Sequence, residues 1–103
     1  MHKLIALYHQ PEDRKHFREH LLGVHLPLVA AFPGLRAMRV GFDAADPSGA
    51  AAPYFAVVEC EFDDENAMRA ALASRAGQAA SADVPNYAGA GVTIVTLQVE
   101  SVS

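Results

Sequence analysis

Apolar residues recur at helical spacing between residues 13 and 32. They are Phe17, Leu21, Val24 and Leu28. At about 100° per residue these four side chains fall within roughly 60° of one another around a helix axis, which is typical of a buried stripe. Asp13 is suited to cap the first turn, and Pro33 with Gly34 should end the helix near Phe32. The pattern therefore predicts one long helix over residues 13–32.

Other segments have the length and composition of strands. We expect strands over residues 2–8, 35–42, 54–62 and 92–99. Further helices are expected from Asp63 or Asp64 to Leu72 and over residues 75–83, and the small, polar run at 43–53 is expected to be a surface loop. The order βαββαβ is that of a ferredoxin-like α+β fold, in which helices cover one face of a four-stranded antiparallel sheet.

The strand over residues 54–62 carries apolar side chains on both faces. One face holds Tyr54, Ala56, Val58, Cys60 and Phe62, and the other holds Phe55, Val57, Glu59 and Glu61. A monomer with helices on one face should be polar on the other face, so this second face needs a cover. The sequence therefore predicts a homodimer packed sheet to sheet through the open face.

Composition and charge exclude several classes of partner. The chain has 103 residues and a net charge of −4 at pH 7, which fits one domain over residues 1–103. Its 8 Lys and Arg residues form no basic stripe, so we expect no nucleic-acid partner. The first residues contain at most five successive apolar residues, so we expect neither a signal peptide nor a membrane span there. The single cysteine favours a reducing compartment and a cytoplasmic location.

His25 is the most informative residue of the first helix, because it lies two positions before Pro27. Proline has no amide hydrogen and its ring pushes against the carbonyl of Gly23, so we expect the helix to bend here. His25 lies about 80° from Phe17 around the helix, at the edge of the apolar stripe, where a side chain is half covered. A titratable imidazole at a bend is a candidate site, although a lone histidine near an apolar face is more often structural.

Several other motifs have simpler explanations. Residues 16–20 read HFREH and match the H-x-x-E-H pattern of some zinc peptidases. Those enzymes need a further carboxylate and a much larger domain, so we expect no metal site. Glu59 and Glu61 have the chemistry of an acid or base, but pairing across strands or at a dimer rim is the commoner role.

Cys60 and Tyr87 complete the set of candidate side chains. Cys60 shares a strand face with Val58 and Phe62, which predicts a buried, neutral and unreactive thiol. Tyr87 follows a Pro-Asn pair near a helix end and fits either the lining of a pocket or plain packing.

Three segments resemble the EthD family of dimeric α/β-barrel proteins: FREHLLGVHLPLVAAFPGLR, PYFAVVECEFDDENAMRAAL and ASRAGQAASADVPNYAGAGVTIV. The most specific pieces are His25-x-Pro27-Leu28, Pro33-Gly34-Leu35 and Gly77-Gln78. The resemblance runs from about Leu4 to Glu100 and implies the ferredoxin-like fold and the sheet-to-sheet dimer. It also implies a role in catabolism or secondary metabolism, since relatives belong to ether degradation and to polyketide and aromatic metabolism.

The resemblance assigns the family's motif histidine to His25, and it places His20 where relatives often have an aromatic residue. We expect a pocket between the sheet and the first helix that binds a small hydrophobic carbonyl or aromatic compound. His25 would act as general acid or base, since an imidazole with a pKa of about 6.5 can do either. Tyr8, His20 and Tyr87 are expected to supply polar groups, with no cofactor and no metal.

Two functions stay open at this point. One is cofactor-independent oxidation, isomerisation or cyclisation. The alternative is a non-catalytic accessory protein or ligand carrier of an oxygenase pathway of the ether-degradation type, in which His25 only bonds a backbone carbonyl freed near Pro27. An imidazole that opens into an apolar cavity would favour catalysis, whereas one satisfied by backbone with no cavity beside it would favour a structural role.

Overall fold

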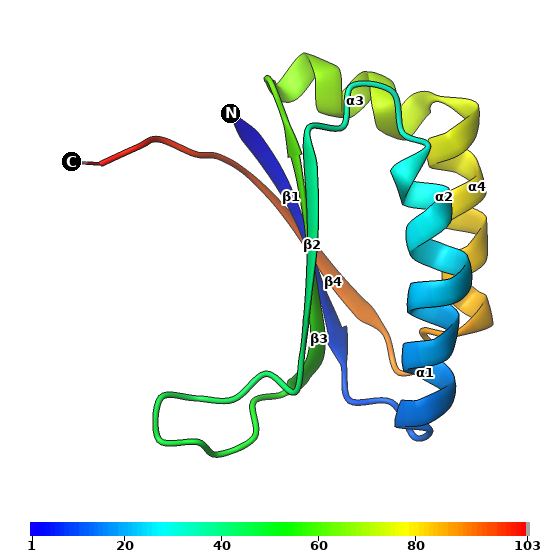
Figure 1. Ribbon diagram of the computed structural model, residues 1–103, viewed down its shortest axis with the longest axis vertical. Helices are drawn as coiled ribbons and strands as arrows, with labels where there is room; N and C mark the ends of the chain where they lie inside the picture. Colours follow the sequence, from blue (N-terminus) through cyan, green and yellow to red (C-terminus); the bar gives the residue numbers. More distant parts are fainter. Residues whose placement is uncertain (103) are drawn as a thin grey trace.

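A layer of helices covers one face of a four-stranded antiparallel sheet in the computed structural model, which describes residues 1–102 (Figure 1). The strands are β1 (His2–His9), β2 (Ala37–Phe42), β3 (Tyr54–Phe62) and β4 (Val92–Gln98). Their order in the sheet is β2-β3-β1-β4. This arrangement confirms the predicted ferredoxin-like α+β fold.

The first helical segment is continuous from Arg14 to Ala30 but changes its winding. It consists of α1 (Arg14–His20), the π-helical turn η1 (Leu21–His25) and α2 (Leu26–Ala30). The second helical segment consists of α3 (Glu65–Ala73), α4 (Arg75–Asp83) and the short 3₁₀ turn η2 (Val84–Asn86). No helix described within residues 1–102 has the length and apolar character needed to cross a bilayer.

Side-chain caps begin the helices where the sequence predicts them. Asp13 accepts a hydrogen bond from the backbone N–H of His16 at 3.0 Å, and Asp64 accepts one from that of Ala67 at 2.8 Å. Each bond satisfies one of the amide hydrogens that a first helical turn leaves free. Asp64 is therefore the cap of α3, while Asp63 pairs with Arg36 at 2.7 Å instead.

The core lies between the helices and the covered face of the sheet. Its largest fully buried side chains are Phe17, Leu21 and Phe62. They are joined by residues that alternate along β1 and β3, where Leu4 pairs with Cys60, Ala6 with Val58, and Tyr8 with Ala56. Burying a Phe or Leu side chain stabilises a fold by about 1.5–3 kcal/mol, so this layer fixes the positions of the helices on the sheet.

The predicted bend before Pro27 takes the form of the π-turn η1. The backbone N–H of Leu26 bonds to the carbonyl of Leu21, five residues back, which widens the helix at the point where the Pro27 ring would press on Gly23. Every inward-facing position after Leu21 consequently moves along by one residue. Val24 is 45% exposed and His25 is 5% exposed, so the predictions of a buried Val24 and a half-covered His25 were wrong.

A bulge changes the predicted faces at the start of β3. Tyr8 pairs with Ala56 and His9 pairs with Tyr54, which leaves Phe55 as an extra residue. Phe55 turns to the covered face, where its ring lies 5.6 Å from that of Phe17 between centroids. The prediction that Phe55 faces the open side was therefore wrong.

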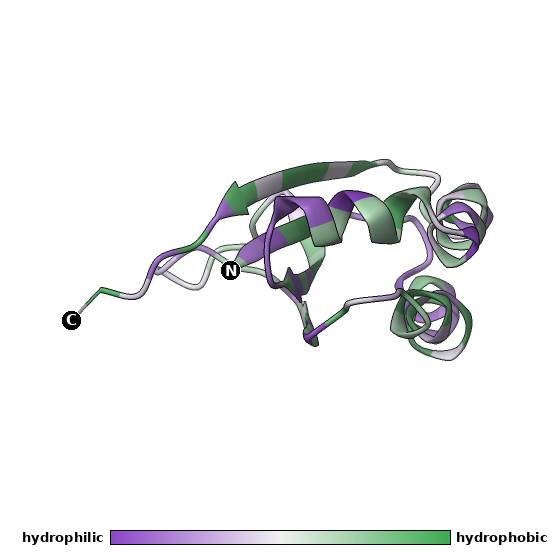
Figure 2. Cartoon of the chain, turned by 90° about the horizontal axis from the view of Figure 1, so that it is seen from above, coloured by the Kyte–Doolittle hydropathy of each residue, from purple (hydrophilic) through white to green (hydrophobic). Residues whose placement is uncertain are grey.

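The open face of the sheet combines apolar residues with one ion pair. Its central side chains are Ile5, Leu7, Val57, Val95 and Leu97. Figure 2 shows the hydrophobic colouring that runs along most of β4. The predicted loop over residues 43–53 and the segment after β4 both extend on this open side, away from the helices (Figure 1).

Candidate functional site

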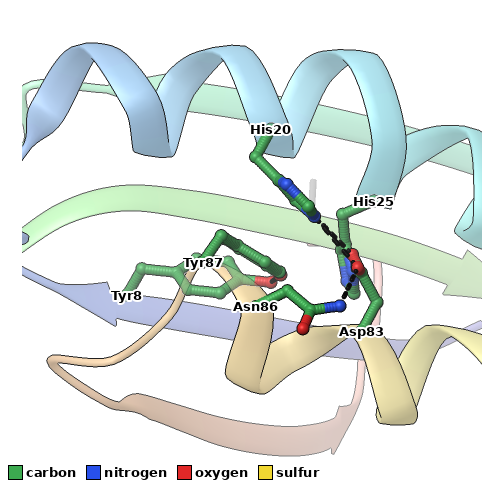
Figure 3. Close-up of polar contacts among 6 residues, drawn as sticks. All are labelled: Tyr8, His20, His25, Asp83, Asn86 and Tyr87. Carbon is green, nitrogen blue, oxygen red and sulfur yellow. Dashed lines mark hydrogen bonds and ion pairs between the residues drawn. The ribbon is translucent and has the colours of Figure 1, made fainter.

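The carboxylate of Asp83, at the end of α4, gathers three side chains from different elements (Figure 3). His25 Nδ1 lies 3.0 Å from Asp83 Oδ2, and His20 Nε2 lies 2.9 Å from Oδ1 and 3.1 Å from Oδ2. The side-chain amide of Asn86 donates to Oδ1 at 3.0 Å. Asp83 is 7% exposed, so these bonds replace the water that a free carboxylate would hold.

The π-turn explains why two histidines five residues apart reach the same carboxylate. In a regular α-helix, residues five apart point about 140° away from each other. The extra residue in η1 brings His25 back to the side of the helix that carries His20, and both rings approach α4. π-Turns of this kind are frequently found at functional sites.

The polar cluster has a definite proton arrangement. Burial disfavours the charged form of Asp83, but the hydrogen bonds from Asn86, His20 and His25 together hold the pKa of its carboxyl below the usual value. Burial lowers the pKa of His25, an effect stronger than the opposing one of its bond to Asp83. A carboxylate only accepts hydrogen bonds. The hydrogen of neutral His25 is therefore on Nδ1, and Nε2 carries a lone pair.

Two tyrosines adjoin this cluster. The hydroxyls of Tyr8 and Tyr87 are 2.6 Å apart, and both side chains are buried. The Tyr87 ring stacks on His20 with 5.0 Å between centroids and lies 4.8 Å from the His25 ring. Burial raises the pKa of both phenols, so both tyrosines are neutral at neutral pH.

His25 and Tyr8 line an apolar cavity between the sheet and the helices. Its volume is about 150 Å³. The other lining side chains include Ala6, Val29, Val58, Cys60, Ala80 and Val92. Leu72 and Ile94 also line it and are 40% and 53% exposed, which places the opening of the cavity between α3 and β4.

The structure brings together all four residues that the sequence singled out, with different positions relative to the cavity. His25 and Tyr8 line the cavity. His20 and Tyr87 stand behind them and contact His25, its carboxylate partner or Tyr8. The imidazole of His25 is bonded to the side-chain carboxylate of Asp83, and not to the backbone carbonyl that the non-catalytic alternative supposed.

Sequence reasoning missed Asp83 and Asn86. One signal was available for Asp83, because the negative charge of a carboxylate is unfavourable at the C-terminal end of a helix. An aspartate as the last residue of a predicted helix therefore calls for a specific partner. Asn86 follows in the short turn η2 and has no comparable signal in the sequence.

The remaining candidate side chains lie elsewhere or are unreactive. Cys60 is buried, as predicted, and burial raises the pKa of its thiol to about 11. Glu59 lies 3.4 Å from Lys3 Nζ on the open face, which confirms the expected pairing across strands. His16 is exposed on α1, outside the cluster around Asp83.

Comparisons with known proteins agree with the fold over nearly the whole chain. Residues 9–91 match the family model described as the EthD domain. A crystal structure of an EthD family protein from Bacillus halodurans is 35% identical, with a TM-score of 0.89 and coverage of 97% of this chain and 99% of that one. An uncharacterized 11.0 kDa protein from the thcB–thcC intergenic region of Rhodococcus erythropolis is 33% identical, over 99% of this chain and 98% of the relative.

A third relative is described by its assembly. A dimeric ferredoxin-like protein of unknown function from Thermobifida fusca is 25% identical, with a TM-score of 0.71 and coverage of 95% of this chain and 90% of that one. The family match spans most of the chain and agrees with the resemblance found in the sequence. The chain belongs to the EthD family.

Proposed function

We propose that this protein binds a small hydrophobic carbonyl compound and moves a proton at the carbon beside the carbonyl, without a cofactor. The observation that supports this most is the neutral His25, held by buried Asp83 at the wall of an apolar cavity. Such an arrangement has the parts of a general base: a lone pair, an orienting partner and an adjacent apolar cavity for the substrate.

In the proposed reaction, one proton moves between the substrate and His25. Nε2 of His25 takes a proton from the carbon beside the carbonyl, and the electron pair of the broken C–H bond leaves an enolate. The imidazolium that forms is stabilised by the Asp83 carboxylate at 3.0 Å, as in other carboxylate–histidine pairs. Return of the proton to a different carbon gives an isomer. When the imidazolium first trades its proton with solvent, delivery of the solvent proton to the original carbon gives isotope exchange.

The roles of the neighbouring residues follow from their contacts. Tyr8 faces the cavity and would bind the substrate oxygen. His20 and Asn86 hold the Asp83 carboxylate in place, and Tyr87 packs against both histidine rings. We propose that His20 and Tyr87 support the site through these contacts.

We also propose that the active form is a homodimer through the open sheet face. Val95 is 42% exposed there, beside Ile5 and Leu7, and apolar residues gathered on an exposed sheet favour a cover. The Thermobifida fusca relative is described as dimeric, which supports a homodimer. Location in the cytoplasm stays a prediction from the sequence.

Deuterium exchange tests the proposed chemistry without knowledge of the natural substrate. Cyclohexanone and acetophenone are incubated with the protein in D₂O, and deuterium uptake beside the carbonyl is followed by NMR. We expect the wild-type chain to accelerate exchange, and His25→Gln to lose about 100-fold or more of that acceleration, since general bases contribute about 10²–10⁴-fold.

His16→Gln is the matched control, because His16 is an exposed histidine of α1 outside the cavity. It should exchange like the wild type. Full exchange by His25→Gln would refute the role of His25. Binding of the ketones by wild type and His25→Gln with equal affinity, and with no exchange by either, would instead establish the ligand-carrier alternative.

A further inference from the structure

On the basis of the proposed proton transfer, we infer that the polar end of the cavity is complementary to an enol, so that single-ring phenols bind there as stable enol analogues. The inference concerns two groups at one end of the cavity, a hydrogen-bond donor on Tyr8 and an acceptor on His25. A hydroxyl group is the smallest group that pairs with both.

The donor follows from counting the hydrogens of the two tyrosines. Each phenol has one hydrogen to donate, and only one of the two hydrogens can lie between the hydroxyl oxygens, which are 2.6 Å apart. The second O–H has no partner among residues 1–102. Tyr8 lines the cavity and Tyr87 does not, so the free O–H is best directed from Tyr8 into the cavity.

The acceptor is Nε2 of His25. Its other ring nitrogen donates to Asp83, so Nε2 offers a lone pair, and no described residue bonds to it. Tyr87 contacts both groups, since its hydroxyl bonds to Tyr8 and its ring lies 4.8 Å from the His25 ring. We therefore assign the free O–H and the lone pair to the same end of the cavity.

Only some oxygen groups satisfy both partners. A ketone or an ether accepts from Tyr8 but has no hydrogen for His25, which leaves a buried acceptor unpaired at a cost in free energy. A hydroxyl accepts from Tyr8 and donates to Nε2. Transfer of the proton from Nε2 of His25 to the enolate oxygen gives the enol and restores the neutral imidazole. This enol has such a hydroxyl, and a phenol carries the same group permanently on a planar ring. Catalysis requires tighter binding of the transition state than of the ketone, and the transition state for proton removal resembles the enol more than the ketone does.

The size and lining of the cavity fit one aromatic ring. The volume is about 150 Å³, and a dry apolar cavity of about that volume in another protein binds benzene. The walls are mostly aliphatic, and the opening at Leu72 and Ile94 gives access from solvent. A planar ring with one hydroxyl therefore matches the apolar walls and the two polar groups together.

Calorimetric titrations of the wild-type chain with phenol, anisole, toluene and cyclohexanone test the inference. We expect phenol to bind about tenfold more tightly than anisole or cyclohexanone, the factor expected from one additional hydrogen bond. The ¹⁵N NMR signal of His25 Nε2 should move on addition of phenol and stay in place with toluene. This series uses only the wild-type protein, so it is decisive even if a variant does not fold.

Tyr8→Phe separates the donor from the rest of the cavity. It should remove most of the preference for phenol and leave the affinity for toluene unchanged. Tyr54→Phe is the matched control, because Tyr54 lies against His9 on the open side of the bulge, away from the cavity. Equal affinity for phenol and anisole, an unchanged preference in Tyr8→Phe, or no binding of any ring would overturn the inference.

The outcomes distinguish this inference from the proposed function. Preferred binding of phenol together with no deuterium exchange of ketones would refute the proposed reaction and keep the enol-shaped site. Exchange of ketones without any preference for phenol would keep the reaction and refute the site described here.

Discussion

The two faces of the sheet hold their charged groups in opposite ways. On the covered side, the carboxylate of Asp83 at the end of α4 is buried and bonded to three side chains. On the open face, Lys3 and Glu59 form a half-exposed pair at 3.4 Å beside apolar neighbours. The first arrangement has a complete set of donors around one charge, and the second leaves both charges partly in water.

This difference in how the charges are held indicates different roles for the two faces. Burying a carboxylate and two imidazoles contributes little to stability compared with well-packed apolar residues, so the cluster on the covered face is better explained by chemistry. The open face carries no comparable cluster among residues 1–102, and its apolar side chains fit contact with a second copy. The two faces can therefore be altered independently.

The largest effect is expected from a charge on the open face. Val95→Glu would bury an unpaired carboxylate between the two sheets, at a cost of several kcal/mol. We expect the dimer to dissociate, and sedimentation equilibrium should give the mass of one chain in place of two.

Ile94→Glu is the matched control for this prediction. It changes the preceding residue of β4, which points to the covered face and is 53% exposed. It should leave the dimer intact. A wild-type chain that is monomeric, or a dimer lost equally in both variants, would contradict assembly through the open face.

A smaller effect, on folding, is expected on the covered face. Asp83→Ala leaves His20, His25 and Asn86 without their common acceptor, and we expect a loss of about 3 kcal/mol in the free energy of unfolding. Urea denaturation at constant chain concentration measures it. Asp63→Ala removes the exposed partner of Arg36 and should change stability much less. Equal losses in the two variants would mean that burial of Asp83 has no energetic consequence.

The smallest effect concerns pH. Because the pKa of His25 is lowered on folding, the unfolded chain binds more protons than the native chain just below the ordinary histidine pKa of about 6.5. The contribution of His25 to stability is complete above that pH and declines as the pH falls. Asp83, whose pKa is also lowered, adds a second loss below about pH 3.9.

Thermal unfolding of wild type and His25→Gln between about pH 7 and pH 5 tests whether His25 makes the protein less stable as the pH falls. The wild type should lose more stability over that range than the variant does. A wild type that gains stability relative to His25→Gln on acidification would show that Asp83 raises the pKa of His25 more strongly than burial lowers it.

Much of the fold follows from local patterns in the sequence. The alternation in β1 and β3, the caps Asp13 and Asp64 and the Pro33-Gly34 stop each depend on neighbouring residues, so they can be recognised in the amino-acid sequence alone. They are sufficient to order the elements and to identify the fold.

The details that build the site depend on distant contacts. The π-turn at Leu21–His25 and the bulge at Phe55 each insert one residue into a regular pattern, and the helical and strand periods assumed for the sequence do not anticipate insertions. The bond between His25 and Asp83 joins residues 58 positions apart. The candidate histidine was therefore visible in the sequence, while its partner and its burial required the fold.

The π-turn also affects how sequences of this family should be aligned. The extra residue of η1 is accommodated within a helix that continues from Arg14 to Ala30. A relative that lacks this residue would keep the same inward-facing stripe, but its two equivalent positions would be four residues apart. An alignment that forbids gaps inside helices would pair His25 with the wrong residue. Such relatives should be compared by structural position, because gain or loss of one codon changes the numbering of the site while leaving its place in the fold unchanged.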